Sequence, residues 1–216
     1  MSEADAIVFV VDDDAAVRRA TERLLRSAGL DVQTFPSAKE FKDHPPVDRP
    51  ACLVLDVSLP GLSGLDLQRE LAASGVRIPI VFITGRGTIP MSVRAMKDGA
   101  VEFLTKPVRT RALLAAIETA IERDRATQRD RRASGALRER YEGLTARERE
   151  VLAFVVAGLQ NKAIAGELAM TERTVKFHRA HVMSKMEAKS IAELVRMAEQ
   201  LGIAPRRSAD PVPKGR

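Results

Sequence analysis

The chain has 216 residues, 45% of them hydrophobic, so it is long enough for two packed domains and too apolar to be disordered over most of its length. Its apolar runs are far shorter than the roughly 20 residues that span a bilayer, and its acidic first residues are unlike a secretion signal, so we expect a cytoplasmic protein without a membrane partner. The net charge of +6 is concentrated after Arg125, where 18 Lys and Arg outnumber 11 Asp and Glu, and this excess suits a polyanion such as DNA.

Short apolar runs alternate with amphipathic stretches five times in the first part of the chain. The runs cover residues 7–11, 32–35, 52–55, 80–83 and 101–104. Continuous β-branched runs are typical of strands that helices cover on both faces. The pattern predicts an α/β doubly wound, flavodoxin-like sheet of five parallel strands in the order 2-1-3-4-5. The only cysteine, Cys52, lies in the third run, where we expect a buried hydrophobe and no disulfide.

A charged segment separates this pattern from the rest of the chain. Between residues 122 and 132 no large apolar side chain occurs, so the segment can bury little surface. We interpret residues 125–138 as a linker between a first domain over 5–124 and a second over 139–202. We interpret it as a solvated extension of the preceding helix as far as Gly135, and a mobile coil is the alternative. Residues 203–216 are predicted to form a disordered tail.

The second domain has helical periodicity only. Thr145 and Glu148 form a capping-box pattern that predicts a helix through Ala157, which Gly158 ends. Three further helices are expected to run from a cap at Asn161 to Leu168, from a cap at Thr171 to about Met186, and from a cap at Ser190 to Leu201. The sequence therefore predicts a small all-α, four-helix domain.

Carboxylates follow two strands that should be neighbours. Asp12 and Asp13 come after the first strand and Asp56 ends the third, so all three should border the crevice at the switch point of the sheet. Carboxylates this close repel each other unless a hard cation such as Mg²⁺ binds them. The pattern predicts a magnesium site with Asp56 as a nucleophile that forms an acyl phosphate. Alternatively these acids are turn and cap residues, the interpretation we prefer for Asp14.

Two more polar side chains join the same edge. Thr84 ends the fourth strand and Lys106 follows the fifth, so a hydroxyl donor and an ammonium should project into the crevice. A phosphatase with an aspartyl nucleophile is a rival interpretation. Such enzymes usually have a second acid two residues after the nucleophile, and here that position is Ser58.

The first domain resembles two-component receiver domains over about residues 5–124. The motifs that carry the resemblance are Val10-Val11-Asp12-Asp13-Asp14, Leu55-Asp56-Val57-Ser58-Leu59-Pro60-Gly61, Ile83-Thr84-Gly85 and Lys106-Pro107. The resemblance implies Mg²⁺ held by Asp12, Asp13, Asp56 and the carbonyl of Ser58. It also implies that Thr84 and Lys106 bind phosphoryl oxygens and that the bond before Pro107 is cis, which X-Pro bonds adopt cheaply. Phe103 occupies the position of the family's switch aromatic, although an ordinary core phenylalanine explains it equally well.

Residues 161–186 have the pattern of a helix, a tight turn and a second helix. Val175, Val182 and Met186 share a face of the second helix that should pack inward. The opposite face presents Arg173, Lys176, Phe177 and Ala180, flanked by Arg179, His181 and Lys185. Cations beside a small residue allow close approach to a DNA groove. An ordinary solvated basic helix is the alternative, and we interpret His178 as structural rather than as a metal ligand.

The second domain resembles LuxR-type helix-turn-helix domains over about residues 139–202. The motifs are Gly143-Leu144-Thr145-Ala146-Arg147-Glu148-Arg149-Glu150-Val151-Leu152, Gly158-Leu159-Gln160-Asn161-Lys162-Ala163-Ile164-Ala165 and Thr174-Val175-Lys176-Phe177-His178. With the receiver-like domain in front, the chain is similar to FixJ-type or NarL-type response regulators. These are not turnover enzymes.

The resemblance also implies how such a protein works. A sensor histidine kinase phosphorylates Asp56, a homodimer forms on activation, and residues 171–186 are the recognition helix for promoter DNA. The expected contacts come from Lys162, Arg173, Thr174, Lys176, Phe177, Arg179, Ala180, His181 and Lys185. Phe177 departs from the small aliphatic residue expected at its position. A receiver whose output is protein binding rather than DNA binding is the remaining alternative.

Overall fold

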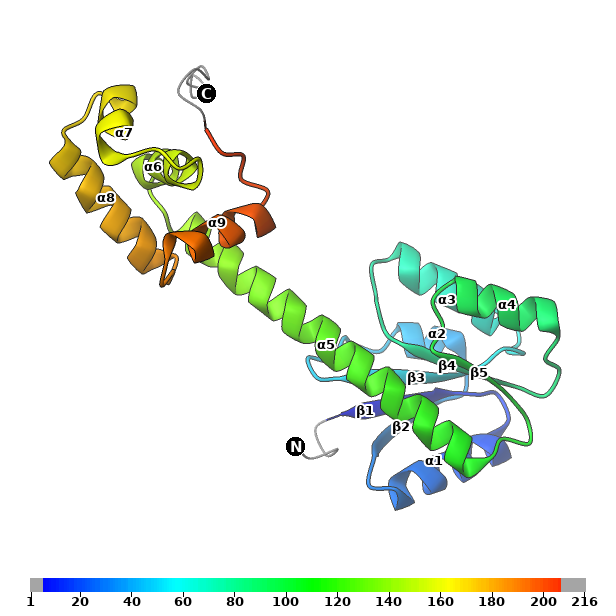
Figure 1. Cartoon of the computed structure of the whole chain (residues 1–216). Coiled ribbons are helices and arrows are strands. Elements are labelled where there is room, and N and C mark those ends of the chain that lie inside the picture. The colour runs from blue at the N-terminus through cyan, green and yellow to red at the C-terminus, as the bar shows by residue number, and fades with distance from the viewer. Residues whose placement is uncertain (1–5, 207–216) are drawn as a thin grey trace. The chain divides into compact units, whose positions relative to one another are not determined.

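The computed structural model describes residues 6–206, which divide into two compact units between Arg129 and Asp130 (Figure 1). In the described part, the first unit contains β1 (Ile7–Val11), α1 (Ala15–Ser27), β2 (Asp31–Phe35), α2 (Ala38–Lys42), β3 (Ala51–Asp56), α3 (Gly64–Ala73), β4 (Ile80–Thr84), α4 (Ile89–Lys97) and β5 (Glu102–Thr105). Helix α5 (Thr110–Glu142) belongs in part to each unit. The second unit contains α6 (Ala146–Val156), α7 (Asn161–Leu168), α8 (Glu172–Lys185) and α9 (Ile191–Gln200).

The five strands form one parallel sheet in the order β2-β1-β3-β4-β5, as predicted. Phe9 and Val11 on β1 pack in a core with α2, α3 and α4, whereas Val8 and Val10 pack in a second core with α1 and α5. The two sets of helices therefore cover opposite faces of the sheet (Figure 1). Burial on both faces explains why the strands are apolar throughout instead of alternating.

Two predictions about single residues of this unit are confirmed. The Asp14 side chain accepts hydrogen bonds from the N–H groups of Ala16 and Val17, so Asp14 is the N-cap of α1. Cys52 is completely buried in the core that contains α1 and α5, and burial raises the pKa of its thiol. A neutral thiol in this position packs as a small hydrophobe.

The second unit has the four predicted helices around one apolar core. The capping box at the start of α6 is present, and Thr171 and Ser190 cap α8 and α9. The predicted cap at Asn161 is wrong. Gln160 holds the N-cap position of α7 without a side-chain hydrogen bond, and the Asn161 side chain instead accepts a hydrogen bond from Arg179 at 2.9 Å.

The linker is helical, as we preferred, but the helix is longer than predicted. Helix α5 continues through Gly135 to Glu142, so only its predicted end at Gly135 and the alternative of a mobile coil are wrong. A glycine inside a helix costs only about 1 kcal/mol, and Leu137 recovers this by burial in the core of the second unit. At the other end of the linker, the Gln128 amide donates to the Arg49 carbonyl in the first unit.

The predicted tail begins too early. The Arg206 N–H donates to the Ala153 carbonyl at 3.0 Å, and its guanidinium lies over the Phe154 ring at 5.4 Å. Ile203 packs against the core of the second unit. Residues 203–206 therefore belong to this unit, and residues 207–216 lie outside the described residues.

Gly64, the first residue of α3, lies against the end of β3. A Cβ atom added there would lie 2.3 Å from the Asp56 carbonyl oxygen and 3.1 Å from the Cα of Val57. The Gly64 N–H also donates to the Val57 carbonyl at 3.0 Å. Because both neighbours are backbone atoms, only a residue without a side chain lets α3 begin this close to the strand end.

We expect Gly64→Ala to lower the free energy of unfolding of the first unit by about 2–3 kcal/mol, because Ala would displace the backbone at Asp56. Gly135→Ala is the matched control, since an added Cβ there meets nothing within 4 Å and Ala favours the helix. Urea unfolding followed by circular dichroism measures the change, and Tyr141, the only tyrosine in a chain without tryptophan, reports the second unit separately by fluorescence. If Gly64→Ala left the free energy of unfolding of the first unit unchanged, the close approach of α3 to the end of β3 would be contradicted.

Candidate functional site

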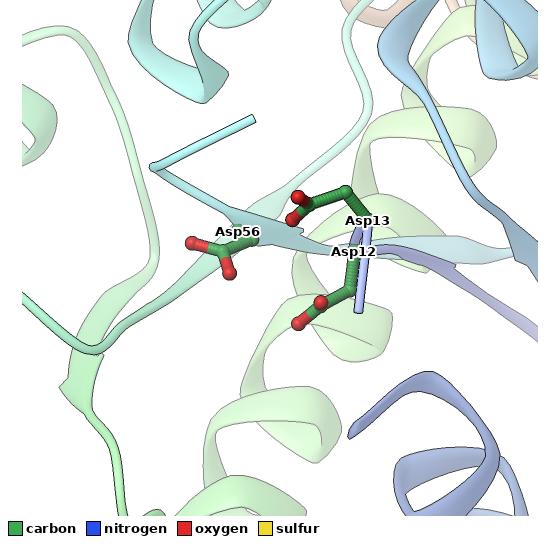
Figure 2. A group of neighbouring side chains, drawn as sticks. All are labelled: Asp12, Asp13 and Asp56. Carbon is green, nitrogen blue, oxygen red and sulfur yellow. The ribbon is translucent and has the colours of Figure 1, made fainter. Parts of the chain in front are cut away.

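The three predicted carboxylates meet at one edge of the sheet. Asp12 and Asp13 directly follow β1, and Asp56 is the last residue of β3. One carboxylate oxygen from each lies within 4.8 Å of the others (Figure 2). Asp12 is fully buried, Asp56 is buried and Asp13 is exposed, so the cluster opens to solvent on the Asp13 side.

The Lys106 ammonium joins two of these acids. Its Nζ lies 2.7 Å from Oδ2 of Asp12 and 2.6 Å from Oδ2 of Asp56. Burial raises the pKa of Asp12 and the charge of Asp56 adds to this, although Lys106 opposes both. Burial works against the charge on Lys106, but its hydrogen bonds to Asp12 and Asp56 outweigh it and raise the pKa of Lys106. Lys106 is therefore held in its cationic form.

Backbone hydrogen bonds orient the two buried acids. Oδ1 of Asp12 accepts from the Asp14 N–H, and Oδ1 of Asp56 accepts from the Ser58 N–H, each at 2.9 Å. Each carboxylate therefore uses one oxygen for its own loop and the other for Lys106. Ser58 thus contacts Asp56 through its N–H, whereas the role that the resemblance implied for Ser58 belongs to its carbonyl.

Thr84 lies beside Lys106 at the end of β4. It is fully buried, and its Oγ1 accepts from the Arg86 N–H at 3.2 Å. The backbone N–H of Lys106 donates to the Thr84 carbonyl at 2.7 Å, which fixes the ends of β4 and β5 together. The peptide bond between Lys106 and Pro107 is cis, as the resemblance implied.

Phe103 lies on β5 next to this group. Its half-buried ring packs on Phe82 with the ring centroids 6.1 Å apart, so it belongs to the edge of the core. Gly87 lies next to both Phe103 and Thr84. A Cβ at Gly87 would come 3.0 Å from the Phe103 ring and 3.1 Å from the Thr84 methyl group.

Three residues at this edge of the sheet were missed by the sequence analysis. Arg18 on α1 donates to the Asp12 carbonyl at 2.6 Å and to the Asp13 carbonyl at 3.3 Å. Gly64 and Gly87 provide space for the strand end and for Thr84. The only available signal was that each glycine follows a predicted strand, Gly64 at the start of the next helix and Gly87 in the next loop. Nothing in the spacing of Arg18 indicated its role.

The predicted recognition face lies on α8. Thr171 accepts a hydrogen bond from the Thr174 N–H as the helix cap, and Val175, Val182 and Met186 are fully buried. The expected DNA contacts Lys162, Arg173, Lys176, Phe177, Ala180, His181 and Lys185 are exposed, whereas Thr174 and Arg179 are half-buried. The inward and outward faces of the helix are thus as predicted.

Three of the expected DNA contacts interact with other helices of the unit. Arg179 donates to Asn161 on α7, as described above. On α6, the buried Glu148 carboxylate lies 2.7 Å from Nζ of Lys185 and 3.4 Å from Nδ1 of His181. Burial opposes the charge on Glu148, but the hydrogen bonds from Lys185 and from Thr145 outweigh it and lower its pKa to about 2. Among the described residues of this face, Arg173 and Lys176 are the cations that make no such contact.

Comparisons with known proteins identify a family for each of the two units. The model of the response regulator receiver domain matches residues 8–118, and that of the luxR family of bacterial regulatory proteins matches residues 142–198. The chain belongs to the response regulator family. It is 53% identical to nodulation protein W of Bradyrhizobium diazoefficiens, over 92% of this chain and 88% of that protein. It is 45% identical to the transcriptional regulatory protein FixJ of Azorhizobium caulinodans, over 94% of this chain and 97% of that protein.

A solved structure supports the same family. The response regulator StyR is 47% identical and has a TM-score of 0.84, covering 91% of this chain and 99% of StyR. The response regulator described here therefore joins a receiver domain to a LuxR-type DNA-binding domain and is a transcription regulator, not a turnover enzyme. None of its described helices combines the length and the apolar character needed to cross a membrane.

We expect Glu148→Gln to lower the free energy of unfolding of the second unit by about 2 kcal/mol at neutral pH, because it removes the partner of Lys185. A depressed carboxyl pKa stabilises the fold fully above its ordinary value of 4.5, and this stabilisation is lost as the pH falls towards 2. The difference in free energy of unfolding between wild type and variant should therefore shrink as the pH falls over this range. Unfolding followed by Tyr141 fluorescence tests this, with Glu150→Gln on the same helix as the control, and a pH-independent difference would contradict it.

Proposed function

We propose that Asp56 of this response regulator accepts a phosphoryl group from a sensor histidine kinase in the cytoplasm and that α8 then binds promoter DNA. The observation that supports the first step is the position of Asp56. Its carboxylate is buried beside Asp12 and within hydrogen-bonding distance of the Lys106 ammonium. A nucleophilic carboxylate needs such cationic neighbours to stabilise the charge on the incoming phosphoryl oxygens.

The acidic cluster fits a bound Mg²⁺ ion. Three carboxylates meet here and Lys106 supplies one positive charge, so the cluster keeps an excess of negative charge that a hard divalent cation would neutralise. Asp12, Asp13 and Asp56 would hold the ion, together with the Ser58 carbonyl that the family resemblance implies. When bound, Mg²⁺ supplies neutralisation of charge on the phosphoryl oxygens.

The remaining residues of the site bind and sense the phosphoryl group. Lys106 contacts Asp56 directly and is placed to bind one phosphoryl oxygen. Thr84 is joined to Lys106 through the backbone, and its hydroxyl would bind another. These bonds exist only in the phosphorylated state, so they can shift the receiver towards an active conformer. Phe103, packed at the edge of the core next to Gly87, would change position with Thr84.

DNA binding is assigned to the exposed face of α8. Arg173 and Lys176 are placed to bind phosphates, and Lys162 on the neighbouring helix α7 adds a third cation. The remaining expected contacts, Thr174, Phe177, Arg179, Ala180, His181 and Lys185, surround this group. A homodimer formed on activation would place two such helices on two half-sites of one duplex.

Asp56→Asn should abolish phosphoryl uptake from a small phosphodonor, because an amide cannot form the acyl phosphate. Asp14→Asn is the matched control. Asp14 lies near the same edge of the sheet but caps α1, and asparagine also caps helices, so this variant should label like wild type. Phosphoprotein is measured by radiolabel transfer or by intact mass. Wild-type labelling of Asp56→Asn would contradict the assignment.

Lys176→Ala should weaken DNA binding at every salt concentration and lower the slope of log affinity against log salt by about one, because one phosphate contact is lost. The control is Lys39→Ala, which removes an equal charge from the exposed part of α2 in the receiver domain and should keep the wild-type slope. Binding to a duplex is measured by fluorescence anisotropy between 50 and 200 mM salt, roughly the range over which such slopes are resolved. An affinity of wild type that does not depend on salt would favour protein binding as the output.

A further inference from the structure

Phe177 is the exposed phenylalanine of this chain. Among the residues that the structure describes, the other phenylalanines are buried or half-buried, whereas 57% of the surface of Phe177 is accessible. Single exposed apolar side chains are common, so exposure by itself needs no function. The position of Phe177 is more informative. It lies in the middle of the α8 face formed by Arg173, Lys176 and Ala180, which are all exposed.

The ring of Phe177 is held by its neighbours. His181, one helical turn later, packs against it with the ring centroids 4.1 Å apart at an interplanar angle of 48°. Nδ1 of His181 lies 3.4 Å from Oε1 of Glu148, and Glu148 is fixed by burial, by Lys185 and by the capping box of α6. A series of contacts therefore connects the core of the domain with an exposed ring. Such a side chain loses little conformational freedom when it binds a partner.

The chemistry of the ring limits what it can recognise in DNA. Phenylalanine offers no hydrogen bond, and most base-edge groups in the major groove are hydrogen-bond donors or acceptors. The apolar group there is the C5 methyl of thymine, which packs against apolar side chains. Ala180 lies three residues after Phe177 with a side chain too small to keep the ring away from a base edge.

We propose that Phe177 recognises the C5 methyl group of a thymine in the DNA that α8 binds, and so determines part of the sequence specificity. This inference rests on the proposed DNA binding by α8. It assigns to Phe177 a contact that depends on the base, whereas Arg173 and Lys176 bind phosphates that are the same in every sequence.

A scan with uracil tests the proposal directly. The full chain selects duplexes from a random-sequence pool, and each thymine of a selected duplex is then replaced by uracil, which removes only the methyl group. The dissociation constant of each duplex is measured at one fixed salt concentration. We expect one thymine in each half-site at which the replacement weakens binding about fourfold, the effect of losing one buried methyl group. Replacement at the other thymines should change binding less than twofold.

Variants connect this effect to the ring. Phe177→Ala should bind the thymine and uracil duplexes equally, whereas Phe177→Leu should keep a preference for thymine because leucine is also apolar. The control is Ile191→Ala, which truncates an exposed apolar residue of α9 and should keep the fourfold effect. Because the Phe177 ring is exposed, its loss leaves the core intact, and Tyr141 fluorescence verifies folding of each variant.

The outcomes separate this inference from the proposed function. If duplexes are selected but uracil has no effect at any position, the methyl contact is wrong and DNA binding stands. The same holds if Phe177→Ala keeps the fourfold effect, because another residue then contacts the methyl group. If the full chain selects no duplex with or without a phosphodonor, DNA binding by α8 and the methyl contact are both wrong.

Discussion

The contact of the Lys106 ammonium with Asp12 and Asp56 is the interaction on which the receiver site depends. Two buried carboxylates this close would repel each other, and the positive charge of Lys106 offsets that repulsion. In the sheet, β4 lies between β3, which ends at Asp56, and β5, which precedes Lys106. The lysine side chain therefore reaches across the end of β4. Thr84 is the residue at that end, and its carbonyl accepts a hydrogen bond from the N–H of Lys106.

A single buried carboxylate has a comparable role in the DNA-binding domain. Glu148 completes the capping box of α6 and pairs with Lys185, so it fixes α8 against α6 through charge as well as through apolar packing. This interaction uses part of the positive charge that composition assigned to DNA. Arg179 is used similarly by Asn161. On α8, the cations that remain for a polyanion are Arg173 and Lys176 in its first turns, where the N–H groups of the helix start also favour phosphate.

The sequence allowed the sheet order and the acidic cluster to be predicted, because parallel strands covered on both faces have a recognisable pattern and their carboxyl ends share one edge. It did not reveal contacts that depend on close approach in space. Nothing in the spacing of Gly64 shows that a strand carbonyl occupies the position of its missing Cβ, and nothing near Arg18 shows that its guanidinium holds the loop of Asp12. The same limit applies to the contact between Lys185 and Glu148. Helical periodicity identifies the outward face but not a buried acid on a neighbouring helix.

The proposed switch follows from competition for hydrogen-bonding groups. A phosphoryl group adds nearly two negative charges and three acceptor oxygens at Asp56, where Lys106 is already bound to two carboxylates. Thr84 now accepts from the N–H of Arg86, so turning its hydroxyl towards a phosphoryl oxygen would alter the loop that contains Arg86 and Gly87. That loop touches the Phe103 ring at Gly87, where even a methyl group would be too close. In the proposed switch, a rotation at Thr84 would therefore act on Phe103 through the loop at Gly87, which lies close to both side chains.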